Sequence, residues 1–233
     1  MKVAIMQPYF FPYIGYFQLI NSVDNFIIYD NIEFTKKGWI NRNRILVNGK
    51  DEFITLPLKK DSDFLYIHQR FLADSFHVDK QKILRRIKES YRKAPYFDDA
   101  YMLVEEVFNF NHYNLFDFIF NSIKTVCSYL EIKTEFIVSS KININHNLKS
   151  EEKVLAICKY FGADTYINAI GGRSLYSHQN FKSENIELRF IQSNEFSYKQ
   201  FDNDFLPWLS IVDLIMFNSK SVLTNQLNNF KIE

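Results

Sequence analysis

The sequence predicts an α/β fold: a layered, mostly parallel sheet with a β-hairpin insertion and a helical middle section. Strand-like and helix-like segments alternate at the start of the chain and again in its last third, as in α/β proteins. Between them lie an Asn48-Gly49 turn signal and a long helical stretch. No linker-like tract divides the chain, so we predict one domain over residues 1–233, with a hairpin excursion at 36–72 and a helical section at 75–132.

The first elements form a βαβ unit. Residues 2–6 are short and apolar, Pro8 and Pro12 interrupt the chain, and apolar residues then recur at helical spacing over 14–20. A second apolar strand follows at 26–29. Because a helix of this length forms a crossover connection, the two strands are expected to run parallel.

The hairpin excursion comes next. Residues 39–47 and 52–58 have strand-like composition and flank the Asn48-Gly49 pair, a strong hairpin signal. Residues 66–72 are expected to add a third antiparallel strand. We place this excursion either within the parallel sheet or at its edge.

The rest of the chain returns to alternation after a helical section. Three apolar stripes at helical spacing lie within 75–132, and Pro95 separates the first two. Further segments are predicted as strands at 135–138, 164–167 and 186–191, a helix at 151–161, and terminal helices from Ser210. Asp213 lies inside an apolar segment of this last part, where it is expected either to be buried with a partner or to cap a helix.

Composition narrows the functional classes. Lys plus Arg is 28 and Asp plus Glu is 27, so a net charge of +1 gives no bulk attraction to nucleic acid. No leader pattern and no apolar run near the ~20 residues of a membrane span is present, so we expect a cytoplasmic protein. The five His and two Cys residues show no metal-ligand spacing, so no metal site is predicted. A basic helix at 80–93 is expected to face solvent, with an anionic partner or a membrane surface as the alternative.

Candidate site residues follow the predicted parallel strands. Ligands of such sheets bind outside the carboxyl ends of the strands, where loops and helix N-termini converge. The polar or glycine residues at these ends are Gln7 and Tyr9 after the first strand, Asp30 after the second, and Asn168, Gly171, Gly172, Arg173 and Ser174 after the fourth. The Gly-Gly-Arg-Ser turn is able to cradle an anion, although it lacks the Walker A ending and the default interpretation is a simple helix start.

A second candidate surface is the basic stretch at 36–44. It carries four cations, two amides and an indole within nine residues. Strand alternation places Arg42 and Arg44 on one face and Trp39, Asn41 and Asn43 on the other. Arginines of this kind hold phosphates while the indole stacks on a base or sugar. A solvated hairpin edge protected by charge explains the same pattern.

Several blocks of the sequence resemble the WbqC-like protein family. The first is Met6-Gln7-Pro8-Tyr9-Phe10-Phe11-Pro12-Tyr13-Ile14-Gly15-Tyr16-Phe17; the others are Asp24, Tyr29-Asp30, Trp39-Ile40-Asn41-Arg42-Asn43, residues 163–167, Gly171-Gly172 and residues 209–215. The resemblance runs along nearly the whole chain. It implies a role in bacterial surface-polysaccharide (O-antigen, lipopolysaccharide) gene clusters.

A second resemblance concerns mechanism. The first strand, its Pro-bearing loop and Tyr13-x-Gly15-Tyr16 look like the HxGH start of nucleotidyltransferases and adenylate-forming ligases, which implies a nucleotidyltransferase-like or Rossmann-like sheet. Tyrosines stand where those enzymes have both histidines. The phosphate-steadying role would pass to other residues: Gln7, Lys36, Lys37, Arg42 or Arg173.

These observations together predict a transferase that binds a nucleotide-sugar and moves an acyl or aminoacyl group to an amino-sugar. The expected roles are orientation of polar groups by Gln7 and Asn41, phosphate binding by Lys36, Arg42 and Arg173, stacking by Tyr9 or Trp39, and proton acceptance by Asp30. The alternatives are a nucleotidyltransferase or ATP-dependent ligase, with ATP and Mg²⁺ as cofactors, and a non-catalytic adaptor of the glycan machinery. The cofactor of the leading function stays open.

Overall fold

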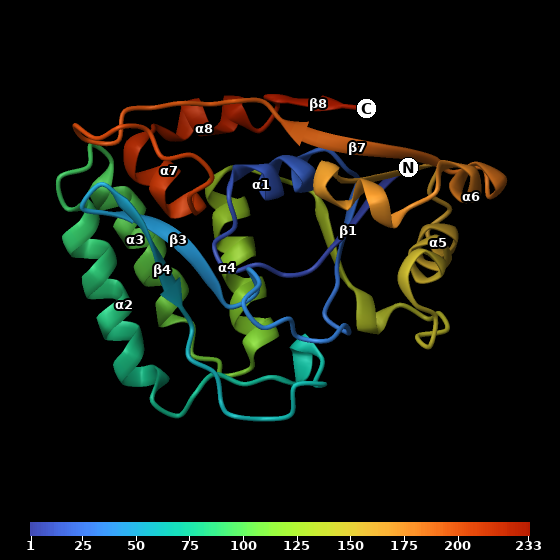
Figure 1. Cartoon of the computed structure of the whole chain (residues 1–233), viewed down its shortest axis with the longest axis horizontal. Helices are drawn as coiled ribbons and strands as arrows, with labels where there is room; N and C mark the ends of the chain where they lie inside the picture. The colour runs from blue at the N-terminus through green and yellow to red at the C-terminus, as the bar shows by residue number, and fades with distance from the viewer.

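A six-stranded sheet forms the centre of the protein in the computed structural model, which describes all 233 residues (Figure 1). Its spatial order is β5-β2-β1-β6-β7-β8, and every neighbouring pair is parallel except β7 with β8. The strands are β1 (Lys2–Met6), β2 (Asn25–Ile28), β5 (Glu135–Val138), β6 (Thr165–Ala169), β7 (Glu187–Ser193) and β8 (Phe230–Ile232). The prediction of a mostly parallel α/β sheet is confirmed.

The strand order creates a switch point. Counted along the chain, the parallel strands lie in the order 3-2-1-4-5, which is the order of Rossmann-like sheets. From β1 the chain moves outward through β2 to β5, and it then returns to the other side of β1 to form β6 and β7. The loops after β1 and β6 therefore leave the sheet in opposite directions and open a crevice between them.

Two apolar cores cover the two faces of the sheet. Alternation along β1 sends Ala4 to one face and Val3 and Ile5 to the other. On the first face, the larger core includes the helices α1 (Ile14–Asn21), α4 (Leu115–Tyr129), α7 (Ile211–Phe217) and α8 (Lys220–Gln226). On the second face, the smaller core is formed with α5 (Ser150–Tyr160) and α6 (His178–Ser183).

A separate two-stranded sheet and three helices form the insertion between β2 and β5. The hairpin strands are β3 (Arg42–Val47) and β4 (Lys50–Thr55), and the helices are α2 (Phe76–Tyr91), α3 (Phe97–Asn109) and α4. Asn48 and Gly49, with φ of 50° and 78°, make the two-residue turn that the Asn-Gly pair predicts. The hairpin lies beside α2 and α7 (Figure 1). It forms its own sheet, so the expected place within the parallel sheet or at its edge is wrong.

The prediction of a third hairpin strand at residues 66–72 is wrong. Residues Ile67–Gln69 form a 3₁₀ turn, and this segment makes only isolated bridges to its neighbours. The Gln69 side chain accepts a hydrogen bond from the Tyr66 backbone N–H at 2.9 Å, which closes the turn and leaves Ile67 in the core. A side chain that satisfies the backbone locally competes with strand pairing.

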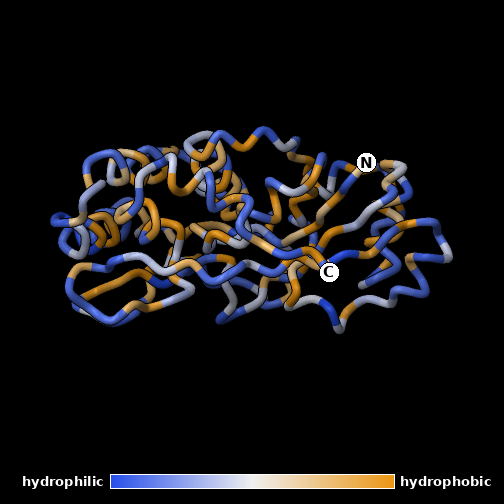
Figure 2. Tube along the Cα trace, turned by 90° about the horizontal axis from the view of Figure 1, so that it is seen from above, coloured by the Kyte–Doolittle hydropathy of each residue, from blue (hydrophilic) through white to orange (hydrophobic).

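The C-terminal strand β8 was missing from the sequence prediction. Its three residues follow α8 and pair antiparallel with the end of β7. Seen from above, hydrophobic stretches run through the middle of the molecule, and hydrophilic stretches are most frequent along its outline (Figure 2). None of the helices is both long and apolar enough to cross a bilayer.

Candidate functional site

A cavity of about 410 Å³ lies at the switch point of the sheet. Its walls come from the end of β1, the first turn of α1, the residues after β2, and the end of β6 with the 3₁₀ helix η3 (Ile170–Leu175). These segments are distant in the chain and meet because β1 and β6 are neighbours in the sheet. Ligands of Rossmann-like sheets bind at this position.

The cavity is lined by tyrosines and amides and has no charged side chain. Besides Tyr16, four tyrosines line it: Tyr9, Tyr13, Tyr29 and Tyr176. Burial raises the pKa of each of them, in the case of Tyr29 to about 12, so all four remain protonated near neutral pH. Such a lining offers flat faces for stacking and hydroxyl groups for hydrogen bonds, without a counter-charge for a phosphate.

Two residues with amide side chains, Gln7 and Asn168, also line the cavity. The Gln7 backbone carbonyl accepts a hydrogen bond from the Tyr16 hydroxyl at 2.9 Å, whereas its side-chain amide has no partner in the protein. Asn168 is 5% exposed, and its Oδ1 accepts from the Ala169 N–H at 2.8 Å. A Cβ on Gly172 would lie 2.8 Å from Asn168 Nδ2, so a side chain at this position would require the amide to move.

Backbone N–H groups at the start of α1 also face this region. The N-cap residue Tyr13 makes no side-chain capping bond, and the N–H groups of Ile14 and Gly15 have no acceptor in the protein. Gly15 lines the cavity. Unsatisfied N–H groups at a helix start attract anionic oxygens.

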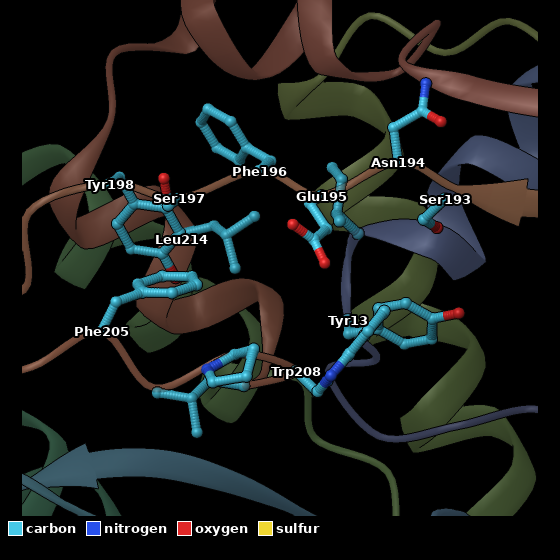
Figure 3. A pocket seen from close by; sticks show the side chains of 13 residues that line it. Tyr13, Ser193, Asn194, Glu195, Phe196, Ser197, Tyr198, Phe205, Trp208 and Leu214 are labelled. Atoms are coloured by element: carbon cyan, nitrogen blue, oxygen red, sulfur yellow. The ribbon is translucent and has the colours of Figure 1, made fainter.

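A second cavity of about 550 Å³ adjoins the first at Tyr13, which lines both (Figure 3). It lies beyond the end of β7, between residues 193–198 and 205–209. A Cβ on Gly15 would overlap the Tyr13 ring and the Ser193 Oγ, so the glycine lets this ring lie across α1 as the wall between the two cavities.

The sequence-predicted site residues divide into four groups. Five of them line the switch-point cavity together: Gln7, Tyr9, Asn168, Gly171 and Gly172. Arg173 and Ser174 are exposed and lie outside it, and the Arg173 Nη1 atom pairs with Glu233 at 2.8 Å. The functional role of each of these residues stays a prediction.

Asp30 is buried beneath this region and does not line the cavity. Its carboxylate accepts from the Ser140 N–H at 2.8 Å and lies 3.4 Å from the His68 Nδ1 atom. Nearby, the buried Lys153 places its Nζ 4.9 Å from the centre of the Tyr29 ring. Burial lowers the pKa of Lys153, and the Asp30 charge opposes this shift. Asp30 therefore contributes to the layer behind the Tyr29 wall.

The hairpin residues bond within their own excursion. The Lys36 Nζ pairs with Asp63 at 2.6 Å. The Asn41 Nδ2 donates to the Leu56 carbonyl at 2.9 Å, and the Arg42 Nε donates to the Gly38 carbonyl at 3.1 Å. None of these three side chains lines either cavity, and Trp39 does not line one either.

The predicted separation of Trp39 from the arginines is wrong. The Arg44 guanidinium lies 5.5 Å from the centre of the Trp39 ring, and the Trp39 and Phe53 rings are 6.1 Å apart. The Arg42 guanidinium lies 4.3 Å from the centre of the same Phe53 ring. Strand β3 begins only at Arg42, so strict alternation does not extend back to residue 39.

Sequence reasoning missed Tyr13, Tyr29, Tyr176 and Lys153 as site residues. Tyr13 and Tyr29 were quoted only as parts of the family resemblance. Tyr176 and Lys153 have no local signal, since isolated tyrosines and lysines occur throughout the chain. No group of three or more His, Cys, Asp or Glu side chains is placed to hold a metal ion.

The fold and the site define an α/β protein of Rossmann-like strand order with an uncharged, tyrosine-lined cavity at its switch point. The chain belongs to the WbqC-like protein family, whose model matches residues 7–224. It is 31% identical over 216 residues to the uncharacterized protein Rv1507c of Mycobacterium tuberculosis, and the match covers 92% of each chain. No solved structure matches the sequence.

Proposed function

We propose that this protein is a transferase that binds a nucleotide-sugar in the switch-point cavity and acts in the assembly of bacterial surface-polysaccharide precursors. The observation that carries the proposal is the position of the cavity, between the ends of β1 and β6, where Rossmann-like sheets bind nucleotides. Membership of the WbqC-like family supports the polysaccharide context, which the sequence resemblance implies.

The lining suggests how such a ligand would be held. The rings of Tyr9 and Tyr176 would stack on the base or sugar, and the Gln7 amide would hydrogen-bond its polar edge. The diphosphate would accept hydrogen bonds from the free N–H groups at the start of α1, because no cation lines the cavity. The proposal does not require the basic hairpin residues Lys36 and Arg42.

The proposed reaction is acyl or aminoacyl transfer to an amino-sugar. The adjoining cavities support a two-substrate reaction, since a donor in one and an acceptor in the other would meet at Tyr13. In this step the ammonium form of the acceptor first gives up a proton to the solvent, and the free amine nitrogen bonds to the acyl carbon. The bond between that carbon and the donor's leaving group breaks, and the leaving group departs with the electron pair and takes up the second proton that the nitrogen loses.

Tyr16 bears on the adenylate-forming alternative. This residue occupies the position of the second histidine in the HxGH resemblance, but it is 4% exposed and its hydroxyl donates to the Gln7 carbonyl. It is therefore already bonded within the protein and does not offer the phosphate contact that a histidine makes in those enzymes.

The first test is binding of nucleotide-sugars to the purified protein, measured as a shift in melting temperature and then by calorimetry. We expect one nucleotide-sugar to raise the melting temperature, and Gln7→Ala to raise its Kd about tenfold through loss of a hydrogen bond. Gln192→Ala is the matched control, because Gln192 also lies near the carboxyl end of a parallel strand but is exposed and lines neither cavity.

The outcomes separate the alternatives. Stabilisation by no nucleotide-sugar, or a Kd that Gln7→Ala leaves unchanged, would contradict the proposed site. Pyrophosphate release on incubation with ATP, Mg²⁺ and candidate acids or sugar phosphates would instead identify a nucleotidyltransferase or ligase. Binding to a protein of the glycan machinery without any nucleotide-sugar binding would identify an adaptor.

A further inference from the structure

We propose that the second cavity binds the ammonium group of a small ligand, through a carboxylate surrounded by aromatic rings. This cavity is formed by residues 193–198 after β7, by Tyr13 at the start of α1, and by residues 205–209 before α7. The choice of ligand rests on the proposed function, whereas the site itself is formed by side chains that, apart from Tyr13, do not line the switch-point cavity.

The walls of the second cavity are two pairs of aromatic rings. The ring centres of Tyr13 and Trp208 are 5.7 Å apart at an angle of 72°, and those of Tyr198 and Phe205 are 5.1 Å apart at 74°. Phe196 completes the set. The faces of such rings carry partial negative charge and attract cations, an ammonium group among them.

Glu195 supplies the charge. It is the only ionisable acid or base among the lining residues besides the tyrosines, and it makes no ion pair and no hydrogen bond in the protein. In Figure 3 its carboxylate points into the space between Tyr13 and Phe205. A carboxylate without a counter-ion, placed among ring faces, favours a positively charged ligand over a neutral or anionic one.

The neighbouring cations are already paired elsewhere. Lys199 lies 3.4 Å from Asp202, and the Arg44 guanidinium pairs with Asp51 at 3.0 Å while it also donates to the Trp208 carbonyl at 3.3 Å. The negative charge of Glu195 is therefore not neutralised by a nearby side chain of this protein.

The backbone of Trp208, which forms part of the aromatic wall, is strained. Its φ is 61°, in the left-handed region that bulky residues rarely adopt, and its side chain is 57% exposed. The surrounding backbone is held by β3, because the Ser210 N–H donates to the Arg44 carbonyl at 2.9 Å. A strained backbone that presents an indole to an open cavity is characteristic of ligand sites.

The ammonium group has two natural sources in the reaction proposed above, an amino-sugar acceptor and an aminoacyl donor. Both would place a cationic nitrogen beside the rings, and both would reach the switch-point cavity past Tyr13. The probes below therefore represent each source with a matched neutral compound.

The test uses Trp208 fluorescence in a Trp39→Phe background, since the chain has only two tryptophans. Glucosamine represents the amino-sugar and glucose is its neutral counterpart. Glycinamide represents the aminoacyl group and propionamide is its neutral counterpart. We expect a saturable change in fluorescence with at least one of the two cations, with a millimolar Kd typical of so small a ligand, and no saturable change with its neutral counterpart.

Glu195→Gln is the decisive variant, and it is expected to raise the Kd of that cation about tenfold or more. Glu152→Gln is the control, because Glu152 is also exposed and unpaired but lies on α5, far from both cavities. Gln7→Ala is expected to leave the Kd of the cation unchanged, which separates this inference from the nucleotide-sugar proposal. Equal binding of cation and neutral counterpart, absence of binding by both cations, or no effect of Glu195→Gln would overturn it.

Discussion

Two glycines shape the switch-point cavity because they have no side chain. Gly172 leaves room for the Asn168 amide, and Gly15 leaves room for the Tyr13 ring. In both cases the glycine is needed for a close approach, because neither residue has a positive φ. Gly171 is different, since a Cβ there would meet no atom within 4 Å.

Gly172→Ala is therefore expected to displace Asn168 and to lower the free energy of unfolding by about 1–3 kcal/mol, the usual cost of overpacking. Gly171→Ala is the matched control and is expected to change the free energy of unfolding by less than about 0.5 kcal/mol. Urea unfolding of the two variants and the wild type measures both values. Equal destabilisation by the two substitutions would show that Asn168 does not require the space at Gly172.

At the scale of elements, one tyrosine joins the hairpin, the helical section and the C-terminal helices. Tyr91, at the end of α2, accepts a hydrogen bond from the Leu46 N–H of β3 at 2.7 Å. The same hydroxyl donates to the Asp213 carboxylate of α7, also at 2.7 Å. All three groups are buried, so no water is available to replace a lost partner.

Tyr91→Phe removes one hydroxyl and leaves both a buried N–H and a buried carboxylate oxygen with one partner fewer. We expect the free energy of unfolding to fall by about 1–3 kcal/mol. Tyr101→Phe is the control, because its hydroxyl makes a single long bond of 3.4 Å to Leu84 and is partly exposed. A loss in Tyr91→Phe no larger than in the control would exclude Tyr91 as a link between these elements.

At the scale of the whole molecule, Asp213 lies at the centre of a buried network between distant segments. Its carboxylate also accepts from the Tyr198 hydroxyl at 2.6 Å and from the Gln200 Nε2 at 2.8 Å. Burial raises the pKa of Asp213, and the hydrogen bonds from Tyr198, Tyr91 and Gln200 oppose the shift. The network supports our prediction of one domain, since it joins the insertion to the C-terminal region.

The raised pKa gives stability a definite dependence on pH. Because the folded pKa lies above the unfolded value, the contribution of Asp213 is complete at low pH and is lost as the pH rises through the folded pKa. The variant Asp213→Asn has no carboxyl group that titrates at this position. We therefore expect the free energy of unfolding of the wild type, relative to this variant, to decrease from about pH 3.8 upward.

Urea unfolding at a series of pH values measures this difference. Fluorescence and circular dichroism should give coincident transitions if the chain unfolds as the single domain that we predict. A difference that stays constant or increases with pH would contradict the raised pKa, and separate transitions would contradict the single domain.

Part of the candidate site could be predicted from local sequence. Gln7 and Asn168 were found because each lies at the carboxyl end of a short apolar strand, and parallel strands bring these ends to one edge. The same reasoning named Asp30, which also follows a strand but is buried behind the cavity wall. Position at a strand end predicts the edge of the sheet and does not predict whether a side chain reaches the cavity.

The basic hairpin shows a second limit. Its turn at Asn48-Gly49 was predictable because the left-handed φ values of the turn suit these residue types. Its distance from the switch point was not, since the hairpin forms its own sheet and Arg42 bonds to neighbours within it. Charge and spacing indicate which ligands a segment is able to bind, whereas tertiary packing decides which other residues lie next to it.

The amino-acid order alone determined the α/β class, the parallel pair of strands at the start of the chain, the helical section, the Asn-Gly hairpin and the family resemblance. Each of these depends on residues close together in the sequence or on a continuous motif. Packing decided the rest. The pairing of β6 beside β1 created the switch-point cavity, and the approach of Trp208 to Tyr13 formed the aromatic wall beside Glu195. Side chains separated by more than 150 residues share a site only because many tertiary contacts bring their segments together. A local sequence pattern does not show these contacts.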